Sequence, residues 1–299
     1  MPFPIFLQQI INGLTVGSLF ALVAIGYTLV FGIIRLINFA HGDVFMMAMY
    51  FGYFAIEALE LPWYSAIAFT VAATAILGIL IERCAYRPLR DQGAPSTTVM
   101  ISAIGISYLL QNLATVLFSG KQKLFPRIKY FTQVLKVGAV SFQRMAVIVP
   151  LVTALLLVIL MLFVNKTKPG MAMRAVSTDM DASHLMGIDV NRIIMLTFGI
   201  GSGLAAVGAV FWGTKYLSVY PLSGSTAGLK CFICAVVGGI GNISGAVLGG
   251  LLLGMTETMV VAFFPTMTSY KDAISFIFLI VVLLIKPTGI ISEKIVKKV

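Results

Sequence analysis

Long apolar runs, separated by short polar segments, recur from one end of this 299-residue chain to the other. Most of them are long enough to cross the ~30 Å hydrocarbon core of a bilayer as a helix, which takes about 20 residues. Charged residues make up only 11% of the sequence, whereas a soluble domain carries about 25%. We therefore expect an all-α integral membrane protein, a single transmembrane domain over 1–299 with about eight transmembrane segments.

The apolar segments define candidate spans. Their bounds in the sequence are 8–34, 44–59, 63–81, 99–117, 146–164, 193–212, 227–237, 244–263 and 273–285. Segment 227–237 stops at Gly238-Gly239, and it is short against the ~20 residues of a full crossing. We therefore expect 227–263 to form a re-entrant or broken helix pair. Irregular backbone at membrane depth is tolerated only where it is buried in protein or lines a cavity.

The basic residues predict how the chain is oriented. Lys and Arg outnumber Asp and Glu by 21 to 11, and they gather in loops such as 83–90 and at Lys294, Lys297 and Lys298. Basic loops stay in the cytoplasm and attract anionic membrane lipid. Residues 1–34 contain no Lys or Arg, which argues against a cleaved signal peptide and for an N-terminus outside. We expect a cytoplasmic C-terminus. We also expect no nucleic-acid partner, because the apolar spans leave no soluble domain that could bind one.

Segment 119–145 conflicts with the positive-inside rule. It is rich in Lys and Arg, yet alternation of the spans makes it an extracytoplasmic loop. Placing it in the cytoplasm would move either 83–90 or 165–192 to the outside, because successive spans alternate in direction. Its alternating polar and apolar residues predict a small hairpin. A basic outer surface could meet an acidic soluble binding protein, and a solvated loop without a partner is the alternative.

A polar segment, 165–192, interrupts the apolar pattern and is expected in the cytoplasm. Pro169 and Gly170 are expected to end the preceding span. A first short helix is expected over 171–176. Thr178 and Asp181 have capping-box spacing for a second short helix, which should run to residue 186.

Two further residues divide this polar segment from the next span. Gly187 is placed as the C-terminal stop of the second short helix, and Asp189 can cap the span that follows. Two interpretations of 165–192 are open. It is either a rigid knob on which an energy-supplying subunit docks, or an ordinary helical loop at the membrane surface.

Sequence motifs run from the first span to the last. They are Asn12-Gly13-Leu14 through Gly17-Ser18-Leu19, Gly26-Tyr27-Thr28-Leu29-Val30-Phe31-Gly32, Asn38-Phe39-Ala40-His41-Gly42, Gly238-Gly239-Ile240-Gly241-Asn242 and Lys286-Pro287-Thr288-Gly289. With Gly-Met-Ala-Met-Arg-Ala at 170–175 and Met-Gly-Ile at 186–188, the chain resembles the branched-chain amino acid permease family of ABC importers. The resemblance is weakest over 119–145.

The resemblance implies a permease subunit of a bacterial inner-membrane importer for branched-chain or related hydrophobic amino acids. Its implied partners are a homologous second permease, two cytosolic ATP-binding subunits and a periplasmic or lipid-anchored amino-acid-binding protein. The chain itself would hold no cofactor, since ATP and Mg would bind the partner subunits. Segment 165–192 would be the coupling loop. Its implied contacts with the ATPase are Gly170, Arg174, Ala175, Ala182, Met186 and Gly187.

Two glycine-rich stretches, 32–42 and 238–250, each hold an Asn near glycines and interrupt an apolar run. Paired broken segments in the two halves of a membrane protein point to a central binding site or gate. Asn38, Gly238, Gly239 and Asn242 are therefore gate candidates. The alternative is that the glycines let helices pack closely.

Ionisable residues within spans are functional candidates by default. Glu257 lies inside an apolar run with no cation close to it in sequence. Lys230 could snorkel outward, or it could form a mainly structural ion pair with Glu257. His41 and Asp43 are expected to cluster with Arg35 at the end of the first span, as an inner gate or as an interfacial turn.

No signature of an enzyme is present. The sequence lacks G-x-x-x-x-G-K-[ST] and G-x-S-x-G, and its two histidines, His41 and His184, are far apart. Cys231 and Cys234 are expected to be small packed residues of a helix rather than metal ligands. Two alternatives to an amino acid importer stay open. One is a related importer of urea, short amides or simple sugars, and the other is a passive channel.

Overall fold

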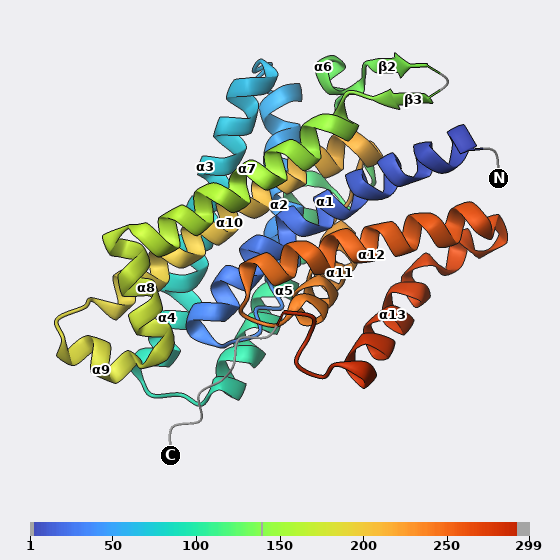
Figure 1. Ribbon diagram of the computed structural model, residues 1–299. Coiled ribbons are helices and arrows are strands. Elements are labelled where there is room, and N and C mark those ends of the chain that lie inside the picture. The colour runs from blue at the N-terminus through green and yellow to red at the C-terminus, as the bar shows by residue number, and fades with distance from the viewer. Residues whose placement is uncertain (1–2, 139, 292–299) are drawn as a thin grey trace.

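The structure is a computed structural model that describes residues 3–138 and 140–291. Helices dominate it (Figure 1), which confirms the predicted all-α class. The longer helices are α1 (Phe3–Ile34), α2 (His41–Glu57), α3 (Trp63–Ile81), α5 (Ser96–Phe118), α7 (Met145–Lys166), α10 (Val190–Tyr216), α11 (Ser223–Gly238), α12 (Ile243–Phe263) and α13 (Lys271–Ile285). The shorter ones are α4 (Arg87–Asp91), α6 (Lys129–Thr132), α8 (Lys168–Thr178) and α9 (Met180–Leu185).

The described residues also contain four short strands, of which the sequence predicted only the hairpin. The hairpin expected within 119–145 is confirmed by β2 (Val134–Val137) and β3 (Val140–Gln143), which pair antiparallel. A second pair joins β1 (Lys123–Leu124) to β4 (Ser218–Val219). The partners of this second pair are far apart in sequence, so no local pattern indicated it.

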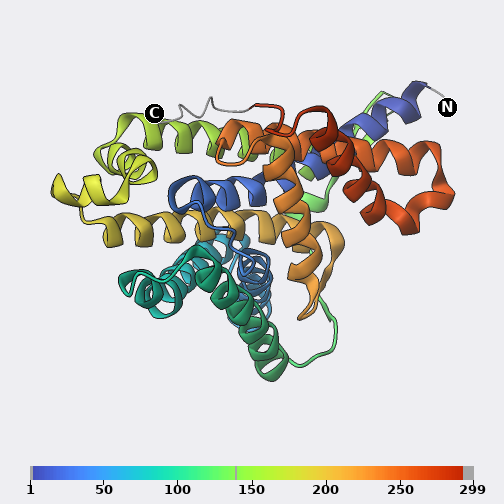
Figure 2. The same ribbon diagram turned by 90° about the horizontal axis from the view of Figure 1, so that it is seen from below.

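Within the described residues, seven helical segments are long and apolar enough to cross a membrane. They are Phe3–Ile34, Trp63–Asp91, Ser96–Phe118, Met145–Lys166, Val190–Tyr216, Ile243–Phe263 and Pro265–Ile285. α2 and α11 are shorter, with 17 and 16 residues. In Figure 2, α1, α7, α10 and α12 run alongside one another, and α11, in light orange, crosses them. α11 therefore meets α1, α2, α12 and α13 within its short length.

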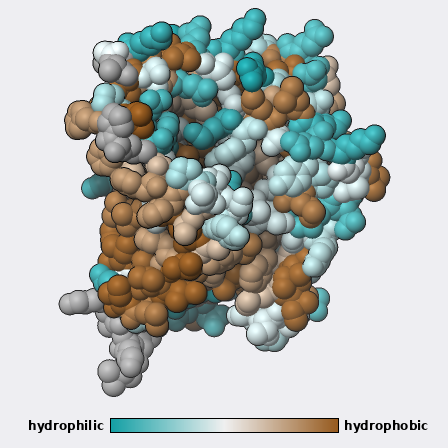
Figure 3. Space-filling view, turned by 90° about the vertical axis from the view of Figure 1, so that its right-hand side faces the viewer, coloured by the Kyte–Doolittle hydropathy of each residue, from teal (hydrophilic) through white to brown (hydrophobic). Residues whose placement is uncertain are grey.

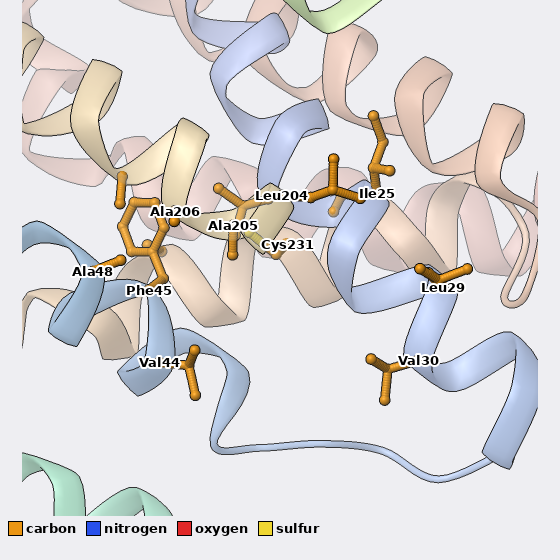
Figure 4. Packing of buried hydrophobic residues seen from close by; sticks show 14 of the residues in the cluster. Ile25, Leu29, Val30, Val44, Phe45, Ala48, Leu204, Ala205, Ala206 and Cys231 are labelled. Atoms are coloured by element: carbon orange, nitrogen blue, oxygen red, sulfur yellow. The ribbon is translucent and has the colours of Figure 1, made fainter. Parts of the chain in front are cut away.

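The core lies where α1, α2, α10 and α11 meet. Ile25 and Leu29 of α1, Phe45 of α2, Ala205 of α10 and Cys231 of α11 belong to one buried hydrophobic cluster (Figure 4). Helices α1 and α12 approach closely along a row of glycines. A Cβ atom at Gly17 would lie 2.7 Å from the Cα of Leu251, so no side chain fits there. This is the close packing that small residues permit in membrane proteins.

The polar segments lie at opposite ends of the helical body. Gln8 near the N-terminus donates a hydrogen bond to the backbone oxygen of Ser141 in β3 at 3.0 Å, so the hairpin and the N-terminus share one end. Figure 3 looks onto that end and shows hydrophilic side chains across its upper part and a hydrophobic patch below. Helices α4, α8 and α9 lie at the other end (Figure 1). Lys294, Lys297 and Lys298 lie outside the described residues.

Candidate coupling and translocation site

The coupling segment begins with a sharp turn between α7 and α8. Thr167 caps α8, and its hydroxyl accepts a hydrogen bond from the Gly170 backbone N–H at 3.2 Å. Pro169 lies in the first turn of α8, where its missing N–H costs nothing. Gly170 is buried against the carbonyls of Phe163 and Val164, so a Cβ atom there would clash. Gly170 therefore shapes the turn rather than presenting a surface.

The expected capping box of the second short helix is wrong. Thr178 is the last residue of α8, and its hydroxyl donates to the Arg174 carbonyl at 3.0 Å. Asp179 caps α9 instead, because its backbone is extended, with φ of −158°. Its carboxylate accepts a hydrogen bond from the Ala182 N–H at 3.0 Å. An N-cap residue needs this non-helical backbone, which the helical Thr178 does not have.

The predicted roles of Gly187 and Asp189 are confirmed, whereas Pro169 and Gly170 lie inside α8 (Lys168–Thr178) and do not end α7, which stops at Lys166. Gly187 follows α9 with a φ of +83°, the left-handed conformation that favours glycine at a helix C-terminus. Asp189 caps α10 by accepting a hydrogen bond from the Arg192 N–H at 3.1 Å. The segment is therefore a pair of helices, α8 and α9, each with a side-chain N-cap.

The far tip of this helix pair is apolar and exposed. Leu185 is 87% exposed and Met186 is 83% exposed. Ala182, His184 and Gly187 around them are also exposed. Exposed apolar side chains rimmed by polar ones are typical of protein contact sites. The tip is therefore a candidate contact site for another protein.

Arg174 connects the coupling segment to the predicted gate. Its guanidinium donates to the side-chain oxygen of Asn165 at 3.0 Å. Arg174 also lines a cavity of about 410 Å³ together with Gly32, Gly241 and Asn242. The structure therefore places a predicted coupling residue and a predicted gate residue on the walls of one cavity, while Ala175 is half-buried beside them.

The break between α11 and α12 is confirmed, and the two glycine-rich stretches meet there. Gly239 and Gly241 have φ values of +112° and +91°, and Asn242 caps α12 by accepting from the Gly245 N–H at 2.9 Å. A Cβ atom at Gly32 would lie 3.2 Å from the Gly241 carbonyl oxygen. The two predicted breaks are therefore in direct contact, at Gly32 and Gly241.

The chain after α13 packs on this same turn. The backbone N–H of Ile290 donates a hydrogen bond to the backbone carbonyl oxygen of Val237 at 2.8 Å, and the N–H of Ile291 donates to that of Gly238 at 2.9 Å. Gly289, with φ of +82°, lies directly against Gly239. The Lys286-Pro287-Thr288-Gly289 motif thus brings the chain back to brace the end of α11.

The interpretation of Arg35, His41 and Asp43 as one interfacial cluster is wrong. Arg35 is exposed, whereas His41 and Asp43 are each 2% exposed. An imidazole nitrogen of His41 lies 3.3 Å from the carbonyl oxygen of Val23. Val23 precedes the end of α1 by 11 residues, which is about 16 Å of helix. The segment 35–40 therefore returns into the body, and α2 begins at mid-depth.

Asn38 and Asp43 hold this returning segment in place. The Asn38 side-chain oxygen accepts from the Ala40 N–H at 3.1 Å and from the Tyr86 hydroxyl at 2.9 Å. The Asp43 carboxylate accepts from the Ser107 hydroxyl at 2.5 Å and from the Gln111 amide at 3.1 Å. Sequence reasoning missed Ser107 and Gln111, although polar residues four apart in an apolar span lie on one helix face.

The predicted ion pair between Lys230 and Glu257 is confirmed, and the alternative that Lys230 snorkels outward is wrong. The two side chains are 2.8 Å apart and 9% and 8% exposed. Lys230 also lies 2.9 Å from Asp272, and the Ser275 hydroxyl donates to Glu257. The ammonium group lies 5.2 Å from the centre of the Phe20 ring. A charged side chain that is buried away from water is more stable beside an opposite charge than alone, which favours this pairing.

A second buried carboxylate lies near the coupling segment. Glu82 is 1% exposed and lies 2.8 Å from Arg90. Arg90 also donates to the side chain of Asn191 at 2.6 Å. This network fastens the segment after α3 to the start of α10, directly behind the coupling helices.

Neither a metal cluster nor a disulfide occurs within residues 3–138 and 140–291. Cys231 and Cys234 are unpaired and buried in α11. They are the packed small residues that the apolar run indicated.

The family model for the permease component of branched-chain amino acid transport systems matches residues 9–283. The chain is 43% identical to the high-affinity branched-chain amino acid transport system permease protein BraD of Pseudomonas aeruginosa, over 98% of each chain. It is 41% identical to the corresponding permease protein LivH of Escherichia coli K12, again over 98% of each.

A solved structure shares the fold. PsaBC from Streptococcus pneumoniae in complex with Fab aligns with a TM-score of 0.50 and 16% identity, over 96% of this chain and 93% of that one. At this identity the likeness concerns the arrangement of the helices alone.

Proposed function

This chain belongs to the family of permease components of branched-chain amino acid transport systems, and from this premise we propose that it carries branched-chain or related hydrophobic amino acids through the bacterial inner membrane. It acts as the membrane subunit of an ATP-driven importer. A homologous second permease completes the pathway, two cytosolic ATP-binding subunits supply the energy, and a periplasmic or lipid-anchored binding protein delivers the amino acid.

One observation carries the coupling part of the proposal. The apolar tip of α9, with Leu185 and Met186 more than four-fifths exposed, stands on two helices fixed by caps and by the Gly170 turn. A rigid knob transmits a push better than a mobile loop does. The proposed coupling contacts are Arg174, Ala175, Ala182, Met186 and Gly187, with Gly170 holding the geometry.

The path from the knob to the gate follows from the shared cavity. Closure of the ATPase pair would press on α9 and α8. Because Arg174 of α8 lines one cavity with Gly32 and Asn242, a shift of α8 would reach the end of α1 and the start of α12. We assign Asn38, Gly238, Gly239 and Asn242 to the moving elements of the gate, with His41 and Asp43 behind them and Glu257 as an anchor.

The orientation follows from the two ends. The knob faces the cytoplasm, where ATP-binding subunits reside. The hairpin of 119–145 and the N-terminus then face outward, where the basic loop can meet an acidic binding protein. In this assignment we give the position of the coupling loop more weight than the positive-inside rule for 119–145.

The experiment that tests the function purifies the tagged chain from gently solubilised native membranes and identifies its partners by mass spectrometry. A second permease and ATP-binding subunits are expected. Liposomes that hold the recovered complex should accumulate labelled leucine only with ATP inside and the binding protein outside. Recovery of the chain alone, passing solute without ATP, would make it a channel. Uptake of urea or a sugar instead of leucine would change the cargo.

A point variant sharpens the docking test. Leu185→Asp puts a charge on the exposed tip and should release the ATP-binding subunits from the purified complex. Leu124→Asp is the matched control, because Leu124 is 75% exposed at the opposite end. Equal recovery of the ATP-binding subunits with both variants would contradict docking at α9.

A further inference from the structure

A cavity of about 460 Å³ lies between α2, α5 and α11, away from the coupling segment. Small-molecule sites typically enclose about 300–1,000 Å³ and combine apolar walls with a few polar groups. This cavity has that character. Its apolar walls include Ile104, Leu222, Leu229 and Phe232, and its polar groups include Tyr27, Asp43, Ser107 and Gln111.

Asp43 is the charged group of the cavity. Its side chain is 2% exposed, and it accepts hydrogen bonds from Ser107 and Gln111 of α5. Both donors are neutral. In the part of the chain that the structure describes, no Lys, Arg or His forms an ion pair with Asp43. The other buried carboxylates, Glu82 and Glu257, each have a basic partner.

The position of Asp43 agrees with a site on the transport path. It lies in the first turn of α2, beside the middle of α1, because segment 35–40 returns into the body. Gly42 packs against Gly228 of α11, where an added Cβ atom would lie 2.8 Å from the Gly228 Cα. The positive end of the α2 dipole favours a carboxylate at this position.

Tyr27 supplies an independent observation. It lines the same cavity and is 5% exposed, yet its hydroxyl has no hydrogen-bond partner among the described residues. Its ring is already held by edge contacts with His41 and Phe232. A buried hydroxyl without a partner is costly, and a bound carboxylate would satisfy it.

We propose that this cavity is a transit site for a zwitterionic amino acid with an apolar side chain. Asp43 pairs with the ammonium group, the Tyr27 hydroxyl donates to the carboxylate, and the apolar side chain lies against Phe232 and Leu229. The inference rests on the proposed function and adds to it a substrate contact within the permease itself. Asp43 acts here as a binding residue and not merely as a tie between α2 and α5.

The test uses the complete complex in liposomes, with labelled leucine as substrate. Asp43→Asn keeps the size of the side chain and its hydrogen-bond acceptor but removes the charge. ATP-driven leucine uptake should fall roughly tenfold to a hundredfold, as expected for loss of a charge-assisted contact. Ser107→Ala is the matched control, because it removes a hydrogen bond of the α2–α5 tie while the charge stays. Because Ser107 itself lines the cavity, the uptake of this variant should fall, but by less than that of Asp43→Asn.

A second readout reports where the amino acid lies. A leucine analogue with a diazirine in its side chain, activated by light during uptake, should label the cavity walls on α5 or α11. Asp43→Asn should abolish this label. Labelling elsewhere, or labelling undiminished by Asp43→Asn, would overturn the proposal.

Tyr27→Phe guards against failure of Asp43→Asn to assemble. Loss of a hydroxyl that has no partner should leave folding intact, and the KM for leucine delivered by the binding protein should rise. Unchanged kinetics of Tyr27→Phe together with equal losses in Asp43→Asn and Ser107→Ala would reduce Asp43 to a structural tie. If the wild type takes up leucine and Asp43→Asn does so equally, this inference fails alone. If the wild type takes up none, the proposed function fails with it.

Discussion

Lys230 of α11 lies 2.8 Å from Glu257 of α12, and both side chains are almost wholly buried. The pair joins the short crossing helix to the long helix that follows the Gly238–Asn242 turn. Asp272 at the start of α13 adds a second carboxylate 2.9 Å from the same ammonium group. One lysine therefore holds three consecutive helices together on one side of the turn.

Removing one member of this pair should destabilise the protein. Lys230→Met leaves the Glu257 carboxylate buried without its cation, which costs about 3–5 kcal/mol. The thermal unfolding midpoint of the purified chain in detergent should fall clearly. Asp272→Asn is the control, because Asp272 is 51% exposed and exposed pairs contribute about 0–1 kcal/mol.

The double variant Lys230→Met with Glu257→Gln checks the cause. Since it removes both charges, it should recover part of the lost unfolding midpoint. A double variant less stable than Lys230→Met alone would show that the packing of the lysine, and not its charge, matters.

Reversal of the charge at Arg174 should uncouple transport from ATP hydrolysis. Arg174→Glu breaks the hydrogen bond to Asn165 and changes the charge in the cavity shared with Asn242. Leucine uptake by the complex in liposomes should drop roughly tenfold, a usual size for coupling between sites. Stimulation of the ATPase by the loaded binding protein should be lost in parallel. Arg174→Lys should retain both activities, and survival of both in Arg174→Glu would contradict the coupling role.

Two glycines with positive φ should respond differently to alanine. Gly187 has open space around it, so Gly187→Ala should cost only the left-handed backbone strain of about 1–2 kcal/mol. Gly239 lies against the backbone of Ile291 as well, so Gly239→Ala adds a clash. The thermal unfolding midpoint of Gly239→Ala should therefore lie well below that of Gly187→Ala. The reverse order would mean that the turn between α11 and α12 can relax.

Labelling of single cysteines tests the orientation. In a background with Cys84→Ser, which removes the exposed native thiol, Lys136→Cys should react with a membrane-impermeant maleimide on intact spheroplasts. His184→Cys should react only after permeabilisation. Both positions are exposed and lie at opposite ends of the helical body. The opposite labelling pattern would invert the assignment of the two ends.

The local chemistry of the chain predicted a large part of this fold. The apolar run 63–81 coincides with α3, and the other runs agree with α1, α5, α7, α10 and α12 to within a few residues at most ends. Gly187 and Asp189 end and begin helices as expected. Failures were also local. Thr178 and Asp179 are adjacent, and both residue types can cap a helix. Only the backbone of Asp179 is extended, so a prediction from residue type alone selected the wrong N-cap.

The site depended on contacts that no local pattern contains. Asp43 meets Ser107 and Gln111 across 64 and 68 residues of sequence, and Lys230 meets Glu257 across 27. Segment 35–40 returns beside Val23. The turn that was expected at the membrane interface therefore lies within the helical body instead. Gly32 and Asn242, from opposite halves of the chain, line one cavity together with Arg174.

By itself, the sequence determined the class of the protein, the approximate ends of most of its long helices, and its family. Hydrophobic length and helix caps act between residues a few positions apart, so they can be read along the chain. Only the tertiary structure decided which polar groups meet, because a charge in an apolar interior takes whichever partner the packing of glycine-rich helices brings within reach. That packing gave Glu257 its lysine and left Asp43 facing a cavity with neutral donors alone.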